Sequence, residues 1–291
     1  MQEPLLVCGA TGRTGRLATT FLLEKGLPVR ALVHTDDARA RALKELGAEV
    51  ILGDLLDAQD VRRALKDIKR AYFVYPQRPG LVEAAAGFAQ AARDAGVEFI
   101  VNMSQWTAGP DATSECAVQQ WAAERELDRL GPPVCHLQPT AFTEWLIMMQ
   151  EMIRQGRYAV PFGPSGTFSS ICVEDIAKVI TVILDDPTGH AGQTYPLYGP
   201  QELSPPEIAT IVGRSLGKEV RYEQITGAEW VNEITGRSIP YLEQHVNGIA
   251  DMHGRGLMAG TNSNVERLTG HKPKSIAEFI KQNQAIWCNN A

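Results

Sequence analysis

Three glycines near the N-terminus are spaced as a dinucleotide-binding turn requires. The segment Gly9-Ala10-Thr11-Gly12-Arg13-Thr14-Gly15 follows an apolar run at residues 5–8 and precedes a helical pattern. A turn between a buried strand and a helix directs backbone amides and the positive end of the helix dipole at one point, which suits a diphosphate. Gly9 then permits the tight exit from the strand, Gly12 the approach of the phosphates, and Gly15 the packing of helix on sheet. A plain strand-to-helix turn is the alternative.

The residues after the next two predicted strands bear on which dinucleotide binds. An acidic residue normally ends the second strand, where it binds the adenosine ribose and repels a 2'-phosphate. His34 stands there instead, and with Arg13 on the turn it favours NADP(H). NAD(H) is the alternative if Asp36 or Asp37 reaches the ribose, and Arg13 and His34 could equally be ordinary solvated surface.

A second acidic residue follows the third predicted strand. Asp54, with Leu55 beside it, ends the sequence Leu52-Gly53-Asp54-Leu55 at the edge of the sheet where ligands bind in open α/β folds. Its carboxylate could accept a hydrogen bond from the adenine amino group. The alternative is an N-cap for the helix that follows, because aspartate favours that position too.

Alternating strands and helices must position these residues. Short apolar runs at residues 5–8, 29–33, 49–52, 71–74, 99–103 and 134–137 are separated by helical patterns. This alternation predicts an α/β fold, a doubly wound parallel sheet of the Rossmann type, over residues 1–155. Residues 156–291 are expected to form a smaller C-terminal α/β substrate lobe, either entirely separate or with segments that return to the main sheet. Capping-box patterns that start at Ser204 and Ser275 mark two of its helix starts.

Composition limits the classes of partner. The net charge of -6 gives no global positive field for a nucleic-acid backbone or an anionic membrane, so we expect a small-molecule ligand. No apolar run is long enough to span a bilayer, and no secretory signal is seen. The five cysteines, at positions 8, 116, 135, 172 and 288, do not have the spacing of metal ligands, so we expect no bound metal. Their scattered positions favour a cytoplasmic protein with reduced thiols. A monomer or a homodimer is expected.

These motifs resemble the NmrA-like branch of the atypical short-chain dehydrogenases/reductases, which includes quinone and triphenylmethane dye reductases and redox-sensing regulators. Besides the glycine turn and Gly53-Asp54, the matching segments are residues 92–97, 161–163, 173–177 and 192–195. The resemblance implies that two segments line the nicotinamide and its ribose. These are residues 73–77, with Val74, Tyr75 and Pro76, and residues 103–105, with Ser104 and Gln105.

One departure from the typical short-chain reductases bears on catalysis. Those enzymes use a Tyr-x-x-x-Lys pair on the substrate oxygen, and this sequence has none. Gln120 stands where relatives often carry lysine or histidine, and an amide cannot relay a proton at neutral pH. A reductase would then position an electron-poor acceptor against the nicotinamide, with Ser104 or Gln105 as weak donors and a proton from water or Tyr75.

Two other functions stay open at this point. The chain could bind the cofactor without turnover, as redox-sensing members of the family do. It could also be a non-redox isomerase or cyclase, for example in secondary metabolism, because a fold does not fix a function. For the reductase we expect a hydrophobic, aromatic or quinone-like substrate. Its expected contacts are Trp106 and, on a predicted helix after residue 137, Phe142, Trp145 and Met149, although such a stripe is more often core.

Overall fold

The computed structural model describes residues 3–288, without the side chain of Cys288, and it divides into two compact units. The first unit comprises Met1–Pro110, Gln119–Gln138 and Val173–Pro196, and the second comprises Asp111–Val118, Pro139–Cys172 and Leu197–Ala291. Within the described part of the chain, no helix is long and apolar enough to cross a membrane. The same residues contain no group of three or more side chains that could hold a metal ion.

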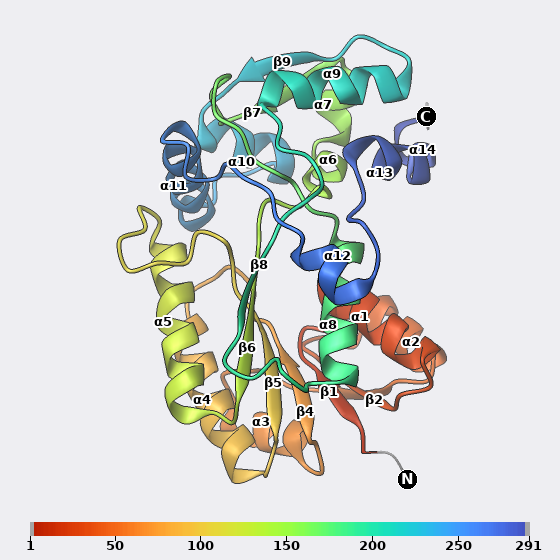
Figure 1. Cartoon of the computed structure of the whole chain (residues 1–291), viewed down its shortest axis with the longest axis vertical. Coiled ribbons are helices and arrows are strands. Elements are labelled where there is room, and N and C mark those ends of the chain that lie inside the picture. Colours follow the sequence, from red (N-terminus) through yellow and green to blue (C-terminus); the bar gives the residue numbers. More distant parts are fainter. Residues whose placement is uncertain (1–2, 289–291) are drawn as a thin grey trace. The chain divides into compact units, whose positions relative to one another are not determined.

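A seven-stranded parallel sheet forms the centre of the first unit (Figure 1). The strand order is β3-β2-β1-β4-β5-β6-β8. From β1 the chain adds β2 and β3 on one side, and it then crosses back to add β4, β5, β6 and β8 on the other side. The predicted doubly wound parallel sheet is therefore confirmed. The strands are β1 (Leu5–Val7), β2 (Val29–Val33), β3 (Glu49–Leu52), β4 (Arg70–Phe73), β5 (Phe99–Met103), β6 (Val134–Pro139) and β8 (Thr194–Leu197).

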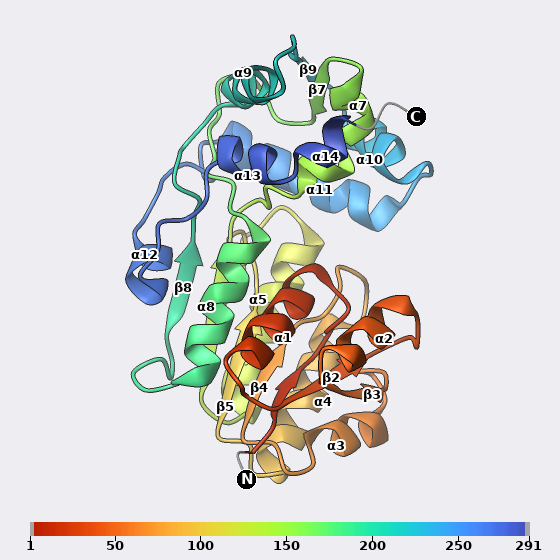
Figure 2. The ribbon, with the colours of Figure 1, turned by 90° about the vertical axis from the view of Figure 1, so that its right-hand side faces the viewer.

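Helices cover both faces of this sheet because successive strand residues point to opposite sides. Leu6 and Cys8 belong to a buried cluster with side chains of α3 (Ala58–Leu65), α4 (Leu81–Asp94) and α5 (Glu115–Leu130). The helices α1 (Arg13–Glu24), α2 (Ala38–Glu45) and α8 (Val173–Asp185) lie on the other side, where α1 and α8 pack side by side (Figure 2). The helices on both faces begin near the ends of the strands. Their polar ends can form a site at that edge of the sheet.

The chain returns to the sheet after residues 139–172, its second stretch in the second unit. Helix α8 packs against α1, and the Arg70 guanidinium of β4 donates to the backbone carbonyls of Leu184 and Asp185 at the end of α8. Strand β8 then adds to the edge formed by β6. The boundary expected at residue 155 differs from this division, since residues 139–155 group with the second unit and residues 173–196 with the sheet.

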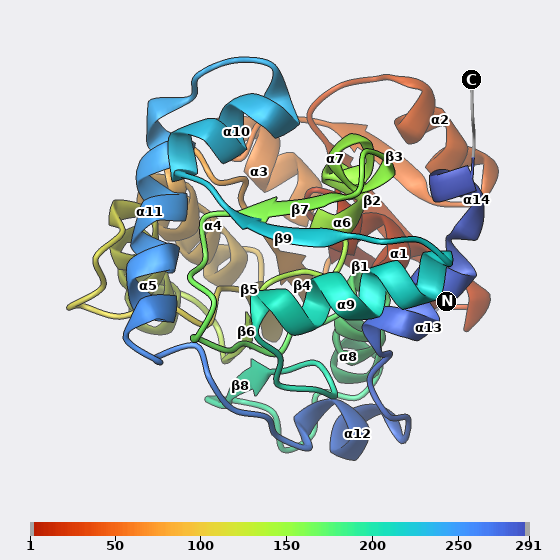
Figure 3. The same ribbon diagram turned by 90° about the horizontal axis from the view of Figure 1, so that it is seen from above.

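The second unit contains a two-stranded parallel sheet and several short helices (Figure 3). Helix α9 (Pro205–Leu216) packs along strands β7 (Arg157–Val160) and β9 (Arg221–Gln224). The remaining helices of this unit are α6 (Trp145–Met148), α7 (Gln150–Arg154), α10 (Gly227–Thr235), α11 (Pro240–Gly254), α12 (Asn264–Thr269), α13 (Ile276–Gln282) and α14 (Gln284–Cys288). Both predicted capping boxes are present, at the starts of α9 and α13.

Candidate functional site

The glycine turn between β1 and α1 is tightly folded on itself. Gly9 has a φ of +56°, in the left-handed region that favours glycine, and a Cβ there would lie 2.9 Å from Cγ1 of Val74. The amide of Gly12 donates to the Gly9 carbonyl at 2.8 Å. A Cβ on Gly15 would lie 2.4 Å from that same carbonyl oxygen, closer than real Cβ atoms come. Gly9 and Gly15 are therefore required by the turn itself, before any ligand binds.

Helix α1 starts without a side-chain cap. Gly12 is its N-cap in an extended conformation, no side chain accepts a hydrogen bond there, and the first turn carries no acidic residue. Gly12 and Arg13 are exposed and Thr11 is half-buried, so the beginning of this helix is accessible to solvent. The first turn of a helix leaves backbone donors unsatisfied when no side chain caps it, and anions bind readily at helix starts of this kind.

Thr14 has a structural partner. Its hydroxyl lies 2.8 Å from the hydroxyl of Tyr72 on β4, and both groups are buried. Burial also raises the pKa of Tyr72 far above its usual range, so this phenol stays neutral. The pair ties the first turn of α1 to the neighbouring strand, and it was not expected from the sequence, where the two residues stand 58 positions apart.

The turn stands where the strand order reverses. Strands β1 and β4 are neighbours, but β1 leads to β2 on one side while β4 leads to β5 on the other. Open α/β sheets bind ligands in the crevice outside the strand ends at this switch point. The contact between Gly9 and Val74 brings the loops after β1 and β4 together there.

The ends of β2 and β3 bring His34 and Asp54 together. Nε2 of His34 lies 3.4 Å from Oδ2 of Asp54, and both side chains are accessible to solvent. Asp54 is not the N-cap of α3, because Asp57 accepts the amides of Gln59 and Asp60 there. In the loop after His34, the carboxylate of Asp37 caps α2 and also pairs with Arg39, which holds the pKa of Asp37 below its usual range.

The positioning of Asp54 depends on a residue that sequence reasoning missed. Asp60 on α3 accepts the backbone N–H of Asp54 at 2.9 Å, and that hydrogen bond holds the pKa of Asp60 below its usual range. Arg63 pairs with the same carboxylate at 2.8 Å. The only sequence signal for this arrangement is the spacing of the three aspartates at positions 54, 57 and 60. One aspartate is enough to cap a helix, so the others could be expected to have another role.

The residues after β5 contain buried polar atoms that have no partner. Oγ of Ser104 and Nε2 of Gln105 are buried and make no hydrogen bond within the described chain. Buried polar groups are nearly always satisfied, so these two atoms are available to a water molecule or a ligand. These two donors follow β5, which is paired directly with β4.

The residues after β4 and β3 have structural contacts of their own. The hydroxyl of Tyr75 donates to the carbonyl of Pro79 at 3.2 Å, and its ring is buried, which argues against Tyr75 as a proton source. Pro76 is exposed, and Leu55 packs partly buried against the core under α3 and α4. Trp106, which follows the unpartnered donors, is half-buried.

The expected substrate residues of the region after β6 belong to the second unit. They do not share one helix, since α6 ends at Met148 and α7 begins at Gln150. Met149 is buried and its sulfur accepts the indole N–H of Trp230 at 3.3 Å, so it has a structural role. Trp145 is half-buried and stacks on Phe162 with ring centroids 6.3 Å apart, and Phe142 bridges to Ile171 through the backbone.

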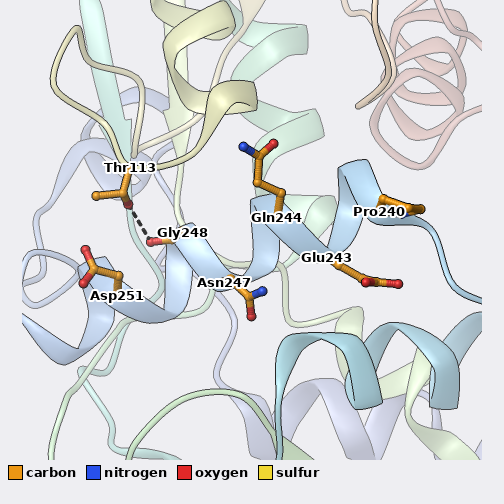
Figure 4. Close-up of a pocket in the computed structure, with 7 residues that line it drawn as sticks. All are labelled: Thr113, Pro240, Glu243, Gln244, Asn247, Gly248 and Asp251. Atoms are coloured by element: carbon orange, nitrogen blue, oxygen red, sulfur yellow. Dashed lines mark hydrogen bonds between the residues drawn. The ribbon is translucent and has the colours of Figure 1, made fainter.

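A pocket of about 500 Å³ also lies in the second unit, along one face of α11 (Figure 4). Its carboxylates have intramolecular partners, because Glu243 accepts from Ser238 and the backbone of Ile239, and Asp251 pairs with Arg255. The pocket is lined by Thr113, Pro240, Glu243, Gln244, Asn247, Gly248 and Asp251.

Next to this pocket, the same helix holds a buried Ser–His pair. Oγ of Ser114 lies 2.8 Å from Nδ1 of His245, and burial lowers the pKa of His245 to about 4. Both side chains are nearly inaccessible, at 1% and 3% exposure. The pair therefore fastens the segment before α5 to α11 rather than presenting a nucleophile.

Comparisons with known proteins agree with this geometry. The model of the NmrA-like family matches residues 1–280. An NAD(P)H azoreductase from Xenophilus azovorans is 33% identical over 287 residues, which is 97% of this chain and 99% of that protein. Among solved structures, an NADPH-dependent quinone oxidoreductase from Escherichia coli complexed with NADPH has a TM-score of 0.83 at 22% identity, covering 96% and 99% of the two chains.

A third comparison gives the same fold. The triphenylmethane reductase from Citrobacter sp., complexed with NADP(H), has a TM-score of 0.82 at 22% identity and covers 96% of this chain and 99% of that one. The match of the family model to nearly the whole sequence, together with the azoreductase identity, shows the relationship directly. The chain belongs to the NmrA-like family.

Proposed function

We propose that this chain is an NAD(P)H-dependent reductase of hydrophobic, aromatic or quinone-like small molecules, and that NADP(H) is its preferred cofactor. The observation that carries the proposal is the uncapped start of α1, which opens at the switch point of the sheet beside the loop after β4. The names of the relatives support it, since they include an NAD(P)H azoreductase and an NADPH-dependent quinone oxidoreductase.

The residues of the first unit fit a dinucleotide. The amides after Gly12 would hold the diphosphate, and the Thr14–Tyr72 pair fixes that turn against β4. Arg13 and His34 are exposed cations or potential cations for a 2'-phosphate. When bound, the cofactor supplies a hydride from its nicotinamide.

The unpartnered donors after β5 have a proposed role in the chemistry. Ser104 and Gln105 would donate hydrogen bonds to the acceptor or to the carboxamide beside it, because their buried polar atoms lack any partner in the chain. Neither group can act as a strong acid, so the proton comes from water. This chemistry suits acceptors that become stable anions after receiving a hydride.

The acceptor is proposed to be an extended aromatic compound. Within the first unit, Trp106 is the side chain that we propose to contact it, because it follows the donors after β5. Met149 of the second unit accepts a hydrogen bond from Trp230 instead. Cys8, Cys116, Cys135 and Cys172 form no disulfide within the described residues, which favours a reducing compartment. We place the protein in the cytoplasm as a monomer or homodimer that does not bind nucleic acid.

Titration with NADPH and NADH tests the first step. Nicotinamide fluorescence should show saturable binding of NADPH, and a folded protein that binds neither dinucleotide would overturn the proposal. Consumption of NADPH is then followed by absorbance with quinone, azo and triphenylmethane compounds. Binding without consumption across that panel would favour a regulatory protein, and conversion of a substrate without any absorbance change would favour an isomerase or cyclase.

Substitution of the unpartnered donors tests their role. Ser104→Ala should leave the dissociation constant for NADPH within about twofold and lower kcat by about tenfold or more, because a donor to the reacting group is removed. Thr107→Ala, a buried hydroxyl in the same loop, is the matched control. Equal effects of the two substitutions would contradict the assignment.

A further inference from the structure

Polar side chains form two rows between α5 and the strands β5 and β6. The first row consists of Asn102, His136 and Asp128. Nδ2 of Asn102 lies 3.0 Å from Nδ1 of His136, and Nε2 of His136 lies 3.0 Å from Oδ1 of Asp128. Asn102 and His136 are buried register partners, whereas Asp128 on α5 reaches solvent. Both ring nitrogens of His136 have partners, so the first row is closed.

The second row lies one step closer to the carboxyl ends of the strands. The amide of Ser104 donates to the Leu137 carbonyl at 2.8 Å, so the pairing of β5 with β6 continues past β5 and places Ser104 beside Gln138. Residues two apart on a strand share a face, so both side chains lie on the α5 face, as those of the first row do. Glu124 of α5 completes the second row, one helical turn from the carboxylate of the first.

The buried carboxylate of Glu124 fixes the neighbouring amide. Nε2 of Gln138 donates to Oε1 of Glu124 at 2.9 Å, and Oε2 of Glu124 lies 3.5 Å from the Arg125 guanidinium. A carboxylate only accepts hydrogen bonds, so Gln138 turns its amino end towards Glu124. The carbonyl end of the Gln138 amide is left for another partner, and no described residue donates to it. This half-buried amide is thereby oriented as an acceptor at the strand ends.

The second row is open at its Ser104 end. Oγ of Ser104 is buried and makes no hydrogen bond within the described chain, although Gln138 stands beside it on the next strand. Each of the two side chains therefore keeps one unused function: the hydroxyl can donate, and the amide oxygen can accept. A ligand that carries an acceptor and a donor side by side satisfies both groups at once.

We propose that Gln138 contacts the acceptor substrate together with Ser104, and that Glu124 is a positioning residue that fixes the Gln138 amide as a hydrogen-bond acceptor. The inference rests on the proposed function of the chain as a reductase and narrows its substrate class. The favoured substrate is a quinone with an N–H or O–H group beside its carbonyl. Ser104 donates to the carbonyl oxygen, and Gln138 accepts from the neighbouring group. The quinone takes a hydride from NADPH and a proton from water, which gives the hydroquinone and NADP⁺.

Two matched quinones test the contact with Gln138. An aminonaphthoquinone with its amino group beside the carbonyl offers the donor, and its dimethylamino counterpart has no N–H. Gln138→Met keeps the length of the side chain without its hydrogen bonds. It should lower the ratio of kcat/KM for the amino compound to that for the dimethylamino compound by about tenfold. The loss should appear in KM, because the contact exists before and during the reaction, and the dissociation constant for NADPH should not change.

Glu124→Gln tests the positioning role. A glutamine at this place can present either end of its amide, so Gln138 is free to turn its amino end towards the substrate. The ratio should fall by about threefold or more, whereas kcat/KM for the dimethylamino compound should stay nearly the same. Asp128→Asn makes the corresponding change one helical turn away, in the closed first row, and should leave the ratio unchanged. Urea denaturation of both variants reports any loss of stability separately.

Ser104→Ala separates the two contacts. The carbonyl that Ser104 binds is present in both quinones, so this variant should lower kcat/KM for both and leave their ratio unchanged. A fall in the ratio in Ser104→Ala equal to that in Gln138→Met would contradict the separate roles.

Three further results would overturn the inference. They are an unchanged ratio in Gln138→Met, equal effects of Glu124→Gln and Asp128→Asn on the ratio, and a weakening of NADPH binding in Gln138→Met that accounts for the whole loss. The last result would place the carboxamide of the cofactor, and not the substrate, at Gln138. Should Gln138→Met fail to fold, the comparison of Glu124→Gln with Asp128→Asn decides. In all these cases the unmodified protein still reduces quinones, whereas a protein that reduces none would overturn the proposed function itself.

Discussion

The starts of α1 and of its neighbours α2 and α3 follow adjacent strands of one sheet but are built differently. Asp37 and Asp57 cap α2 and α3, each accepting two backbone amides, whereas α1 begins at Gly12, which has no side chain to accept any. Helix α4 also begins at a glycine, but it places Glu83 in its first turn. The first turn of α1 has no acidic residue. Helices α2 and α3 therefore satisfy amides of their own first turns, whereas no side chain does so for α1.

The same contrast extends to the second unit. Helices α9, α10 and α13 begin with complete capping boxes at Ser204, Thr226 and Ser275. A cap of this kind contributes about 1 kcal/mol to helix stability. Helix α1 forgoes that contribution and is held instead by the Thr14–Tyr72 hydrogen bond and by its packing on α8.

The largest effect is expected from Gly15→Ala. The added Cβ meets the Gly9 carbonyl oxygen at 2.4 Å and the Ala10 Cα at 3.0 Å, and backbone atoms cannot move aside as a flexible side chain can. We expect a loss of about 3 kcal/mol or more in the free energy of unfolding, measured by urea denaturation. Gly87→Ala, on α4 with no atom near the added Cβ, is the control and should be neutral or stabilising.

Gly12→Asp would convert the start of α1 into a copy of the starts of α2 and α3. The new carboxylate would cap the helix but occupy and repel the phosphate position, so the dissociation constant for NADPH should rise by about 100-fold, or about 2.7 kcal/mol. The free energy of unfolding should stay within about 1 kcal/mol, because the cap offsets the 3.0 Å contact with Gly9. Gly12→Asn has the same shape without the charge and should weaken binding less. Retained affinity in Gly12→Asp would break the comparison.

A capped helix should respond in the opposite way. Ser275→Ala removes the side chain that accepts the Glu278 amide and should lower the free energy of unfolding by about 1 kcal/mol. The dissociation constant for NADPH, measured in parallel by fluorescence, should not change. A loss of binding in this variant would mean that stability, and not an open helix start, governs affinity.

The smallest effect is the pH dependence of the capping boxes. The hydrogen bond from Ser275 holds the pKa of Glu278 below its usual range, so its stabilisation is full above the unfolded pKa of about 4.3 and is lost as pH falls through the lower folded value. Urea denaturation should show a steeper loss of stability below about pH 4.3 in the unmodified protein than in Glu278→Gln. Parallel loss in both proteins would show that this box contributes nothing measurable.

The sequence was sufficient to predict the sheet and the turn, because both depend on local patterns. Apolar runs alternate with helical segments, and Gly9, Gly12 and Gly15 stand at the first junction between a strand and a helix. The capping boxes at Ser204 and Ser275 were equally readable, since a hydroxyl and a carboxylate three residues apart define them.

The contacts of individual side chains could not be predicted in the same way. The approach of His34 to Asp54 depends on the register of β2 and β3, and the partner of Thr14 lies on a strand 58 residues away. The choice of Asp57 over Asp54 as the cap of α3 depends on where the chain leaves β3. A return of segments from the lobe to the sheet was among the expectations, but which residues return, 173–196, depends on long-range pairing that periodicity does not report.

The return of residues 173–196 to the sheet determines when the first unit can fold during synthesis. Helix α8 covers α1, Arg70 binds the end of α8, and β8 completes the edge of the sheet, so the first unit needs residues up to 196. During synthesis, the glycine turn leaves the ribosome early. The face of α1 that packs against α8 stays exposed until more than half of the chain has been made. A truncated protein that ends near residue 155 would expose the buried face of α1. It should aggregate even though it contains the whole glycine turn.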